Sequence, residues 1–142
     1  MAEEPSVNIR AYRAADRDGL VDLWRTAFPN TPPHNEPARM IDAKLAVDGL
    51  ILIAEENEIV VGACMAGYDG HRGWLYALAV RPESRRKGLG VRIVLHAVEK
   101  LRELGCIKVN LQIRSDNAEV EAFYQTLGFA REDRISMGLR ID

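Results

Sequence analysis

Residues 74–113 follow a strand–turn–helix–strand pattern, and this order constrains the fold more than any other feature of the chain. The segment 74–80 is apolar and typical of a buried strand. A turn containing Gly88 follows, and a helix is predicted from there to about Leu104. A second strand is predicted at 108–113. Because a strand, a helix and a strand in succession return the chain in its original direction, the two strands should be parallel and joined by a right-handed crossover.

The chain before this pattern predicts an antiparallel meander of three strands. Its strands are separated by the polar turn 56–58 and by Asp69-Gly70, a dipeptide typical of tight hairpins. One more strand and two amphipathic helices precede it, with a stiff, proline-rich loop at 29–33 between the helices. The predicted strands are 8–12, 50–54, 59–68 and 74–80. The predicted N-caps of the two helices are Asp16 and Asn35. The apolar face of the first helix consists of Leu20, Leu23, Trp24 and Ala27, and that of the second consists of Met40, Ile41, Leu45 and Ala46.

After the crossover, the pattern predicts one more helix and a final pair of strands. The helix begins at Asp116 or Asn117 and ends near Leu127, and the strands are predicted at 129–131 and 135–140. The predicted fold class is therefore α/β or α+β, with a mixed, mostly antiparallel sheet and flanking helices.

The composition excludes several classes of function. The 142 residues include 19 Lys and Arg against 21 Asp and Glu, for a net charge of -2, which gives no electrostatic basis for binding nucleic acid. Cys64 and Cys106 have neither CxxC nor zinc-ligand spacing, so we expect reduced thiols and no metal site. The sequence has no pattern of a signal peptide or of a membrane span, which needs roughly 20 apolar residues. With no repeat or Gly/Ser linker, we expect one cytoplasmic domain over residues 1–142.

The turn at 85–90 is where the sequence predicts a ligand site. Gly88 and Gly90 lie where the turn opens into a helix, whose first N–H groups lack an intrahelical partner and whose dipole is positive. The glycines allow close approach to the backbone, and the basic run 85–87 adds positive charge, so the turn can hold a pyrophosphate. An ordinary turn with solvated basic side chains fits the same residues. The fingerprints GxxxxGK[ST] and GxGxxG are absent from the sequence, which disfavours nucleoside triphosphates and NAD.

Two motifs of this sequence resemble those of the GCN5-related N-acetyltransferases, the GNAT family. The segment 78–83, Leu-Ala-Val-Arg-Pro-Glu, leads into Arg85-x-x-Gly88-x-Gly90, which matches the acetyl-CoA motif [Q/R]-x-x-G-x-[G/A] at its three specified positions. Asn117 and the segment 122–129 are similar to the ending N-x-x-A-x-x-x-Y-x-x-x-G-F, with Ala122 slightly off the usual alanine position. The predicted order of elements follows the family fold over nearly the whole chain. The segment 67–73 resembles the small bacterial YpeA-like subgroup.

The resemblance implies a GNAT-type sheet in which two parallel strands splay apart and admit the pantetheine arm of acetyl-CoA. Backbone groups of Leu78 and Val80 would pair with the amides of that arm. N–H groups from Arg86 to Val91 would hold the pyrophosphate. Asn117 would bind the arm near its thiol, and a role as helix N-cap fits it equally well. The implied acetyl-CoA site, which contains no metal, is formed by Leu78, Ala79, Val80, Arg85, Arg86, Lys87, Gly88, Leu89, Gly90, Val91 and Asn117.

Tyr124 matches the catalytic general acid of the family, which protonates the departing CoA thiolate. A weak acid suffices, because a thiol with a pKa of about 8.5 is a tolerable leaving group. The alternative is a core aromatic residue beside two phenylalanines. The base is not evident: where ribosomal-protein N-terminal acetyltransferases carry a glutamate, this chain has Gln112, which puts a protein N-terminal acceptor in doubt. The substitutes considered are His71, Asp69 and Glu55, each of which also has a structural explanation.

The sequence thus predicts an acetyl-CoA-dependent N-acetyltransferase that acetylates a primary amine by direct attack in a ternary complex. The alternative is a non-catalytic acyl-CoA-binding sensor or regulatory module. Gln112 favours this alternative, whereas Tyr124 favours the enzyme. The acceptor, a small molecule or a peptide amine, should enter beside the helical hairpin 16–47. There Glu36 could attract a cationic amine, and His34 is either a specificity residue or a solvated one. No nucleic-acid or membrane partner is expected, and a homodimer is compatible with the sequence.

Overall fold

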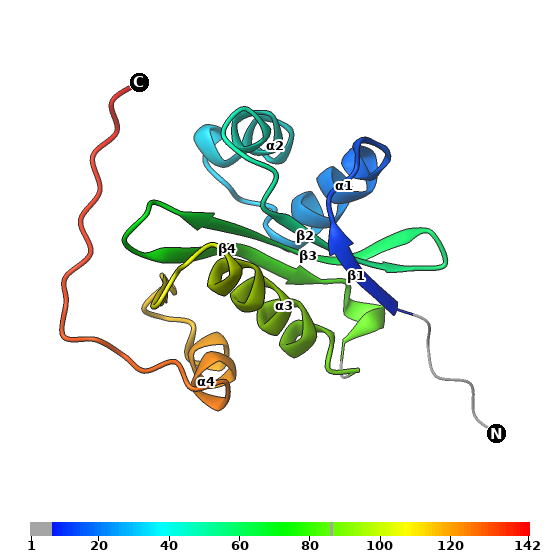
Figure 1. The fold of residues 1–142 in the computed structure, drawn as a ribbon. Helices are drawn as coiled ribbons and strands as arrows, with labels where there is room; N and C mark the ends of the chain where they lie inside the picture. Colours follow the sequence, from blue (N-terminus) through cyan, green and yellow to red (C-terminus); the bar gives the residue numbers. More distant parts are fainter. Residues whose placement is uncertain (1–6, 86) are drawn as a thin grey trace. The chain divides into compact units, whose positions relative to one another are not determined.

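The computed structural model describes residues 7–85 and 87–142, so the predicted site residue Arg86 lies outside the described residues (Figure 1). The chain forms two compact units, Met1–Leu111 and Gln112–Asp142. Among the described residues, the first unit contains a sheet and three α-helices, and the second contains one α-helix and the C-terminal segment.

The sheet of the first unit has the strand order β1-β2-β3-β4-β5. Neighbouring strands are antiparallel from β1 to β4, whereas β4 and β5 are parallel, which confirms the predicted meander and the parallel pair. β5 is shorter than the predicted strand at 108–113. The strands are β1 (Val7–Ala11), β2 (Ile51–Glu56), β3 (Ile59–Tyr68), β4 (Gly73–Val80) and β5 (Val109–Leu111).

Helices cover both faces of this sheet (Figure 1): α1 and α2 lie on one face, and α3 lies on the other. Leu20, Leu23 and Trp24 form the inner face of α1, and each is at most 1% exposed. Their helical spacing is the reason that one face of α1 is buried, as predicted. Together with Ile41 of α2 and side chains of the sheet they form one hydrophobic core. The helices are α1 (Arg17–Ala27), α2 (Pro37–Leu45) and α3 (Leu89–Glu103).

The predicted N-cap of α2 was wrong by one residue. Glu36, not Asn35, is the N-cap, and its carboxylate accepts a hydrogen bond from the N–H of Arg39 at 3.2 Å. Asn35 instead ends the short 3₁₀ helix Pro33–Asn35. The prolines of this loop tighten the chain into that extra turn, so the α-helix begins one residue later than the capping pattern predicts.

Asp16 is the N-cap of α1, as predicted, but its side chain makes no capping hydrogen bond. Its carboxylate accepts two hydrogen bonds from the guanidinium of Arg10, at 2.7 and 2.9 Å, and one from the N–H of Arg13 at 2.7 Å. The same guanidinium donates to Glu55 at 2.9 Å. Burial raises the pKa of Asp16, but the Arg10 and Arg13 hydrogen bonds and the charge of Arg10 outweigh burial and hold that pKa below its usual value. The network fastens the start of α1 to β1 and β2.

We expect Asp16→Asn to lower the free energy of unfolding by about 1.5 kcal/mol at pH 7, since hydrogen bonds to charged groups contribute about 1.5–3 kcal/mol. The pKa of Asp16 is lower in the folded protein than in the unfolded chain, so its carboxylate stabilises the fold above the unfolded pKa of about 3.9. That stabilisation is lost as the pH falls through the folded pKa. Urea unfolding measures this effect: the difference in free energy of unfolding between the wild-type protein and Asp16→Asn should be smaller at pH 3 than at pH 7. Asp42→Asn, which breaks an exposed ion pair with Arg17, is the matched control and should cost much less, because solvent screens an exposed pair. An equal loss in both variants would contradict this prediction.

The second unit contains α4 (Ala118–Thr126), which begins and ends close to the predicted bounds. The predicted final strands at 129–131 and 135–140 are absent among the described residues 112–142. Alternating apolar residues made a strand the natural expectation for the second segment, but a strand also needs a neighbouring strand to accept its backbone hydrogen bonds. The alternating side chains are 87–92% exposed: Ile135, Met137, Leu139 and Ile141.

Within the described part of the chain, no helix has the length and the apolar character that crossing a membrane requires.

Candidate functional site

The second half of β4 continues beyond its parallel pairing with β5. Within the described residues that pairing covers Gly73–Leu75. Farther along, the N–H of Arg81 donates to the carbonyl of Val61 on β3 at 2.8 Å. Backbone groups of successive residues point to opposite edges of a strand. Val80 therefore directs its N–H and C=O away from β3, and so does the C=O of Leu78, so that this edge of β4 can accept another extended chain.

A β-bulge interrupts β4 immediately before this edge. Ala77 and Leu78 together lie opposite the single residue Cys64 of β3. Ala77 has a φ of 53°, in the left-handed region that residues other than glycine rarely adopt. Bulges of this kind occur frequently next to functional sites, where they redirect backbone groups. The flanking register pairs Ala63 with Ala79 and Met65 with Tyr76.

β4 leads through a short 3₁₀ helix, Pro82–Ser84, into the start of α3. Gly88 is the N-cap of α3 and has a φ of 71°, again in the left-handed region. Apart from its two chain neighbours, no described residue has a heavy atom within 4 Å of a Cβ added at Gly88, so the described part of the chain leaves space in front of this backbone. Among the described residues, the first hydrogen bond of α3 runs from the N–H of Arg92 to the carbonyl of Gly88 at 3.1 Å. The N–H groups of 89–91 are therefore the donors of the first helical turn that an anion could use.

The basic residues predicted at this turn differ in what they contact. The Arg85 Nε donates to the carbonyl of Val80 at 3.2 Å, which ties the turn to the open edge of β4. Lys87 Nζ lies 3.9 Å from the Glu56 carboxylate, and both side chains remain partly exposed. Of the other predicted residues, Ala79 and Leu89 are buried at 6% and 2% exposure, so their side chains belong to the core. The N–H of Leu89 lies in the first turn of α3, whereas the backbone groups of Ala79 face β3.

Two of the three residues considered as the general base, Asp69 and Glu55, already accept hydrogen bonds within the protein. The Asp69 carboxylate accepts hydrogen bonds from the N–H groups of Arg72 and His71, both at 2.7 Å, and these bonds hold the pKa of Asp69 below its usual value. Glu55 accepts from Arg10 in the network described above. A low pKa or an ion pair makes a carboxylate a poor proton acceptor. His71 is exposed in the same hairpin turn, and its Nδ1 lies 3.4 Å from the Arg72 guanidinium.

In the second unit, Asn117 is the N-cap of α4, because its side chain accepts a hydrogen bond from the N–H of Val120 at 3.2 Å. This confirms the capping interpretation and leaves the ligand role as a prediction. Tyr124 is 6% exposed, and its ring packs edge-to-face with Phe123 and Phe129 at centroid distances of 5.0 and 5.3 Å. The Gln112 amide donates to the hydroxyl of Ser136. The ring packing holds Tyr124 in a fixed orientation, which a general acid requires as much as a core residue does.

The predicted acceptor loop presents less negative charge than its sequence indicates. Glu36 forms an ion pair with Arg25 at 2.7 Å, and with its capping bond to Arg39 this lowers the pKa of Glu36. Its charge is therefore already balanced. His34 is exposed in the same loop.

Two residues of the site were not identified from the sequence. Trp24 was predicted only as a core residue of α1, and Ala77 was not singled out. The structure joins them by a hydrogen bond of 2.9 Å from the indole N–H to the carbonyl of Ala77. The sequence offers no signal for a left-handed alanine in the middle of an apolar strand.

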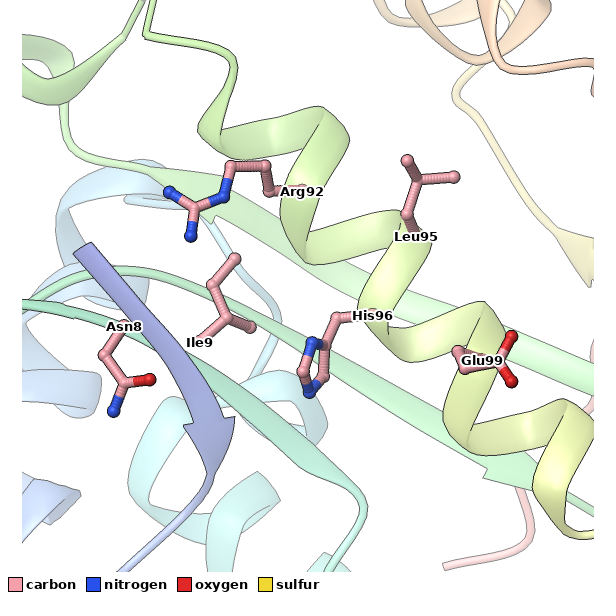
Figure 2. Close-up of a pocket in the computed structure, with 6 residues that line it drawn as sticks. All are labelled: Asn8, Ile9, Arg92, Leu95, His96 and Glu99. Carbon is pink, nitrogen blue, oxygen red and sulfur yellow. The ribbon is translucent and has the colours of Figure 1, made fainter. Parts of the chain in front are cut away.

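A separate open hollow of about 460 Å³ lies between β1 and α3 (Figure 2). Figure 2 shows Arg92, His96 and Glu99 along the α3 side of it and Asn8 on β1. None of the described residues of the predicted acetyl-CoA site lines it. Its wide, open form and mixed lining distinguish it from the strand edge and turn described above. No group of three or more metal-ligating side chains occurs in the ranges 7–85 and 87–142.

Comparison with known proteins places these features in a wider context. Residues 17–129 match the sequence model of the acetyltransferase (GNAT) family. The acetyltransferase ECA0875 of Pectobacterium atrosepticum is 37% identical over 136 residues, which make up 95% of this chain and 96% of that protein. The solved structure of the aminoglycoside N-acetyltransferase AAC(6')-Iy in complex with CoA is similar with a TM-score of 0.83 at 17% identity, covering 99% of this chain and 98% of that one. Glucosamine-6-phosphate N-acetyltransferase from Arabidopsis thaliana is similar with a TM-score of 0.70 at 21% identity, covering 96% and 99%.

Proposed function

Because this chain belongs to the acetyltransferase (GNAT) family, we propose that it transfers the acetyl group of acetyl-CoA to a primary amine by direct attack in a ternary complex. The observation that carries the proposal is the continuity of two backbone features. The edge of β4 at Leu78 and Val80 leads within a few residues to the first turn of α3. An extended amide chain and a pyrophosphate, joined as they are in CoA, need these two kinds of partner in this order.

The pantetheine arm would bind as a short additional strand along β4. The N–H and C=O of Val80 and the C=O of Leu78 supply hydrogen-bonding groups that point away from β3. The pyrophosphate would lie on the N–H groups that follow Gly88, with Arg85 and Lys87 supplying positive charge. The side chains contribute little specificity, which explains why the sequence motif at this turn consists mainly of glycines.

The reaction needs one proton removed and one supplied. The neutral amine attacks the thioester carbonyl, the carbon–sulfur bond breaks, and the CoA thiolate leaves. We assign the protonation of the thiolate to the hydroxyl of Tyr124, which matches the family motif. For the amine proton we favour an ordered water over a dedicated side chain, since Asp69 and Glu55 are engaged and Gln112 cannot accept a proton.

The acceptor would enter beside the loop between α1 and α2. The similar fold of an aminoglycoside N-acetyltransferase supports an amine as the acceptor class. The pairing of Glu36 with Arg25 argues against this carboxylate as the main contact for a cationic amine. We therefore expect recognition by other polar side chains of the loop, such as Asn30 and His34.

Thiol release from acetyl-CoA, measured across a panel of small amines and peptides of different basicity, tests this function. We expect turnover with at least one primary amine, and an acidic limb of kcat/KM that follows the pKa of the amine supplied. A limb that stays at one pH for all amines and disappears in His71→Ala would identify His71 as the base and refute the water route. CoA binding without turnover of any amine would favour a non-catalytic acyl-CoA sensor instead.

A further inference from the structure

We propose that Trp24 is a positioning residue for acetyl-CoA, because its indole N–H holds the β4 bulge in the form that turns Leu78 and Val80 toward the cofactor. This inference rests on the proposed function, since it concerns the same strand edge. It assigns to a core residue of α1 a role in setting the geometry of a binding site on β4.

The bulge decides which residues of β4 face the cofactor side. At the start of β4, the N–H of Gly73 donates to the carbonyl of Lys108, on the β5 side, at 2.9 Å. In an uninterrupted strand, Arg81, eight residues later, would point its N–H to that same side. It points instead to Val61 on β3. The extra residue at the bulge has therefore reversed the alternation, and without it Val80 would be turned toward β3.

Trp24 acts on the peptide group at the centre of the bulge. Its Nε1 donates to the carbonyl of Ala77 at 2.9 Å, and its side chain is fully buried. The carbonyl of Ala77 and the N–H of Leu78 belong to one planar trans peptide and point in opposite directions. Fixing the carbonyl toward the indole therefore also fixes the direction of the Leu78 N–H.

The bulge needs such an anchor because its conformation is unfavourable by itself. Ala77 has a φ of 53°, and a non-glycine residue stays in this region only where its surroundings hold it. A buried indole N–H in turn requires an acceptor, so the hydrogen bond stabilises both partners. Leu20, one turn earlier on α1, is equally buried but can contribute only packing.

The test compares Trp24→Phe with Leu20→Val, a matched core substitution on the same helix. CoA binding is measured by calorimetry, and KM for acetyl-CoA, kcat and Tm are measured for each protein. We expect Trp24→Phe to raise both the Kd for CoA and KM about tenfold, the change expected from one lost or misplaced hydrogen bond, and to change kcat less. Leu20→Val should lower Tm but leave KM within about twofold, since it removes packing alone.

A rescue variant separates the anchor from general stability. Glycine adopts a positive φ freely, so Ala77→Gly in the Trp24→Phe background should keep the bulge without the indole and restore KM to within about threefold of wild type. If Trp24→Phe does not fold, benzothienylalanine at position 24, which replaces the N–H by sulfur in a ring of nearly the same shape, takes its place.

Three results would overturn the inference. They are an unchanged KM in the position-24 variant, an equal rise in Leu20→Val, and no rescue by Ala77→Gly. In each of these cases wild-type binding of CoA would leave the proposed function intact. Failure of the wild-type protein to bind CoA would instead refute the proposed function, and this inference with it.

Discussion

Tyr124→Phe should lower kcat about 100-fold while changing the Kd for acetyl-CoA by less than about twofold. The substitution removes only the hydroxyl, and the edge-to-face contacts of the ring with Phe123 and Phe129 remain. General acid catalysis contributes about 10²–10⁴-fold. The thiolate that the hydroxyl would protonate forms only as the carbon–sulfur bond breaks, so the loss should appear in kcat and not in binding. Steady-state kinetics and calorimetry on the same preparations measure both quantities.

Phe129→Leu is the matched control for ring packing. It removes one of the two aromatic contacts of Tyr124 and keeps the hydroxyl, so it should lower Tm with only a small effect on kcat. A Tyr124→Phe protein with nearly full kcat would return Tyr124 to a purely structural role. A large loss of kcat in Phe129→Leu would show that orientation of the ring matters as much as the hydroxyl.

Gly88→Val should weaken CoA binding about 100-fold. A branched side chain at this N-cap would occupy the open space in front of the first turn of α3. Hydrogen bonds to charged groups contribute about 1.5–3 kcal/mol each, so blocking two backbone donors accounts for a loss of this size. The φ of 71° adds a cost to folding, because a left-handed conformation costs a non-glycine residue roughly 1–2 kcal/mol. The substitution should therefore lower Tm as well, and calorimetry must be performed below the new Tm.

Gly105→Val separates these two effects. Gly105 follows the other end of α3 and has a φ of 96°, and an added Cβ there would likewise meet no heavy atom of the described residues within 4 Å, its chain neighbours excepted. It should suffer a similar loss of Tm while its affinity for CoA stays at the wild-type value. Equal losses of affinity in the two variants, or unchanged affinity in folded Gly88→Val, would remove the pyrophosphate from this turn.

Local patterns in the sequence were sufficient for most of the first unit. The helical spacing of Leu20, Leu23 and Trp24 predicted the buried face of α1, and Asp69-Gly70 predicted the hairpin between β3 and β4. The strand–helix–strand order predicted the parallel pair of β4 and β5. These features follow from interactions within a few residues or from chain direction alone, which is why the sequence determines them.

The errors occurred where a local pattern competes with more distant partners. Asn35 has a good capping side chain, but the 3₁₀ turn of the preceding prolines moves the helix start to Glu36. The alternation from Ile135 to Ile141 is typical of a strand, yet no strand forms in the described residues 112–142, because alternation cannot supply a partner for the backbone. The predicted charge of Glu36 is present but is balanced by Arg25.

The sequence by itself determined the family, the positions of Gly88 and Tyr124 in its motifs, and the order of the strands and α-helices in the first unit. The tertiary structure alone decided which backbone groups of β4 are available to a ligand. That outcome depends on the bulge at Ala77, whose left-handed conformation has no signal in an apolar strand and is anchored by Trp24 from a helix 53 residues earlier in the chain. A hydrogen bond between side chain and backbone over such a separation exists only once helix and sheet have packed together, and for this reason no local pattern could predict it.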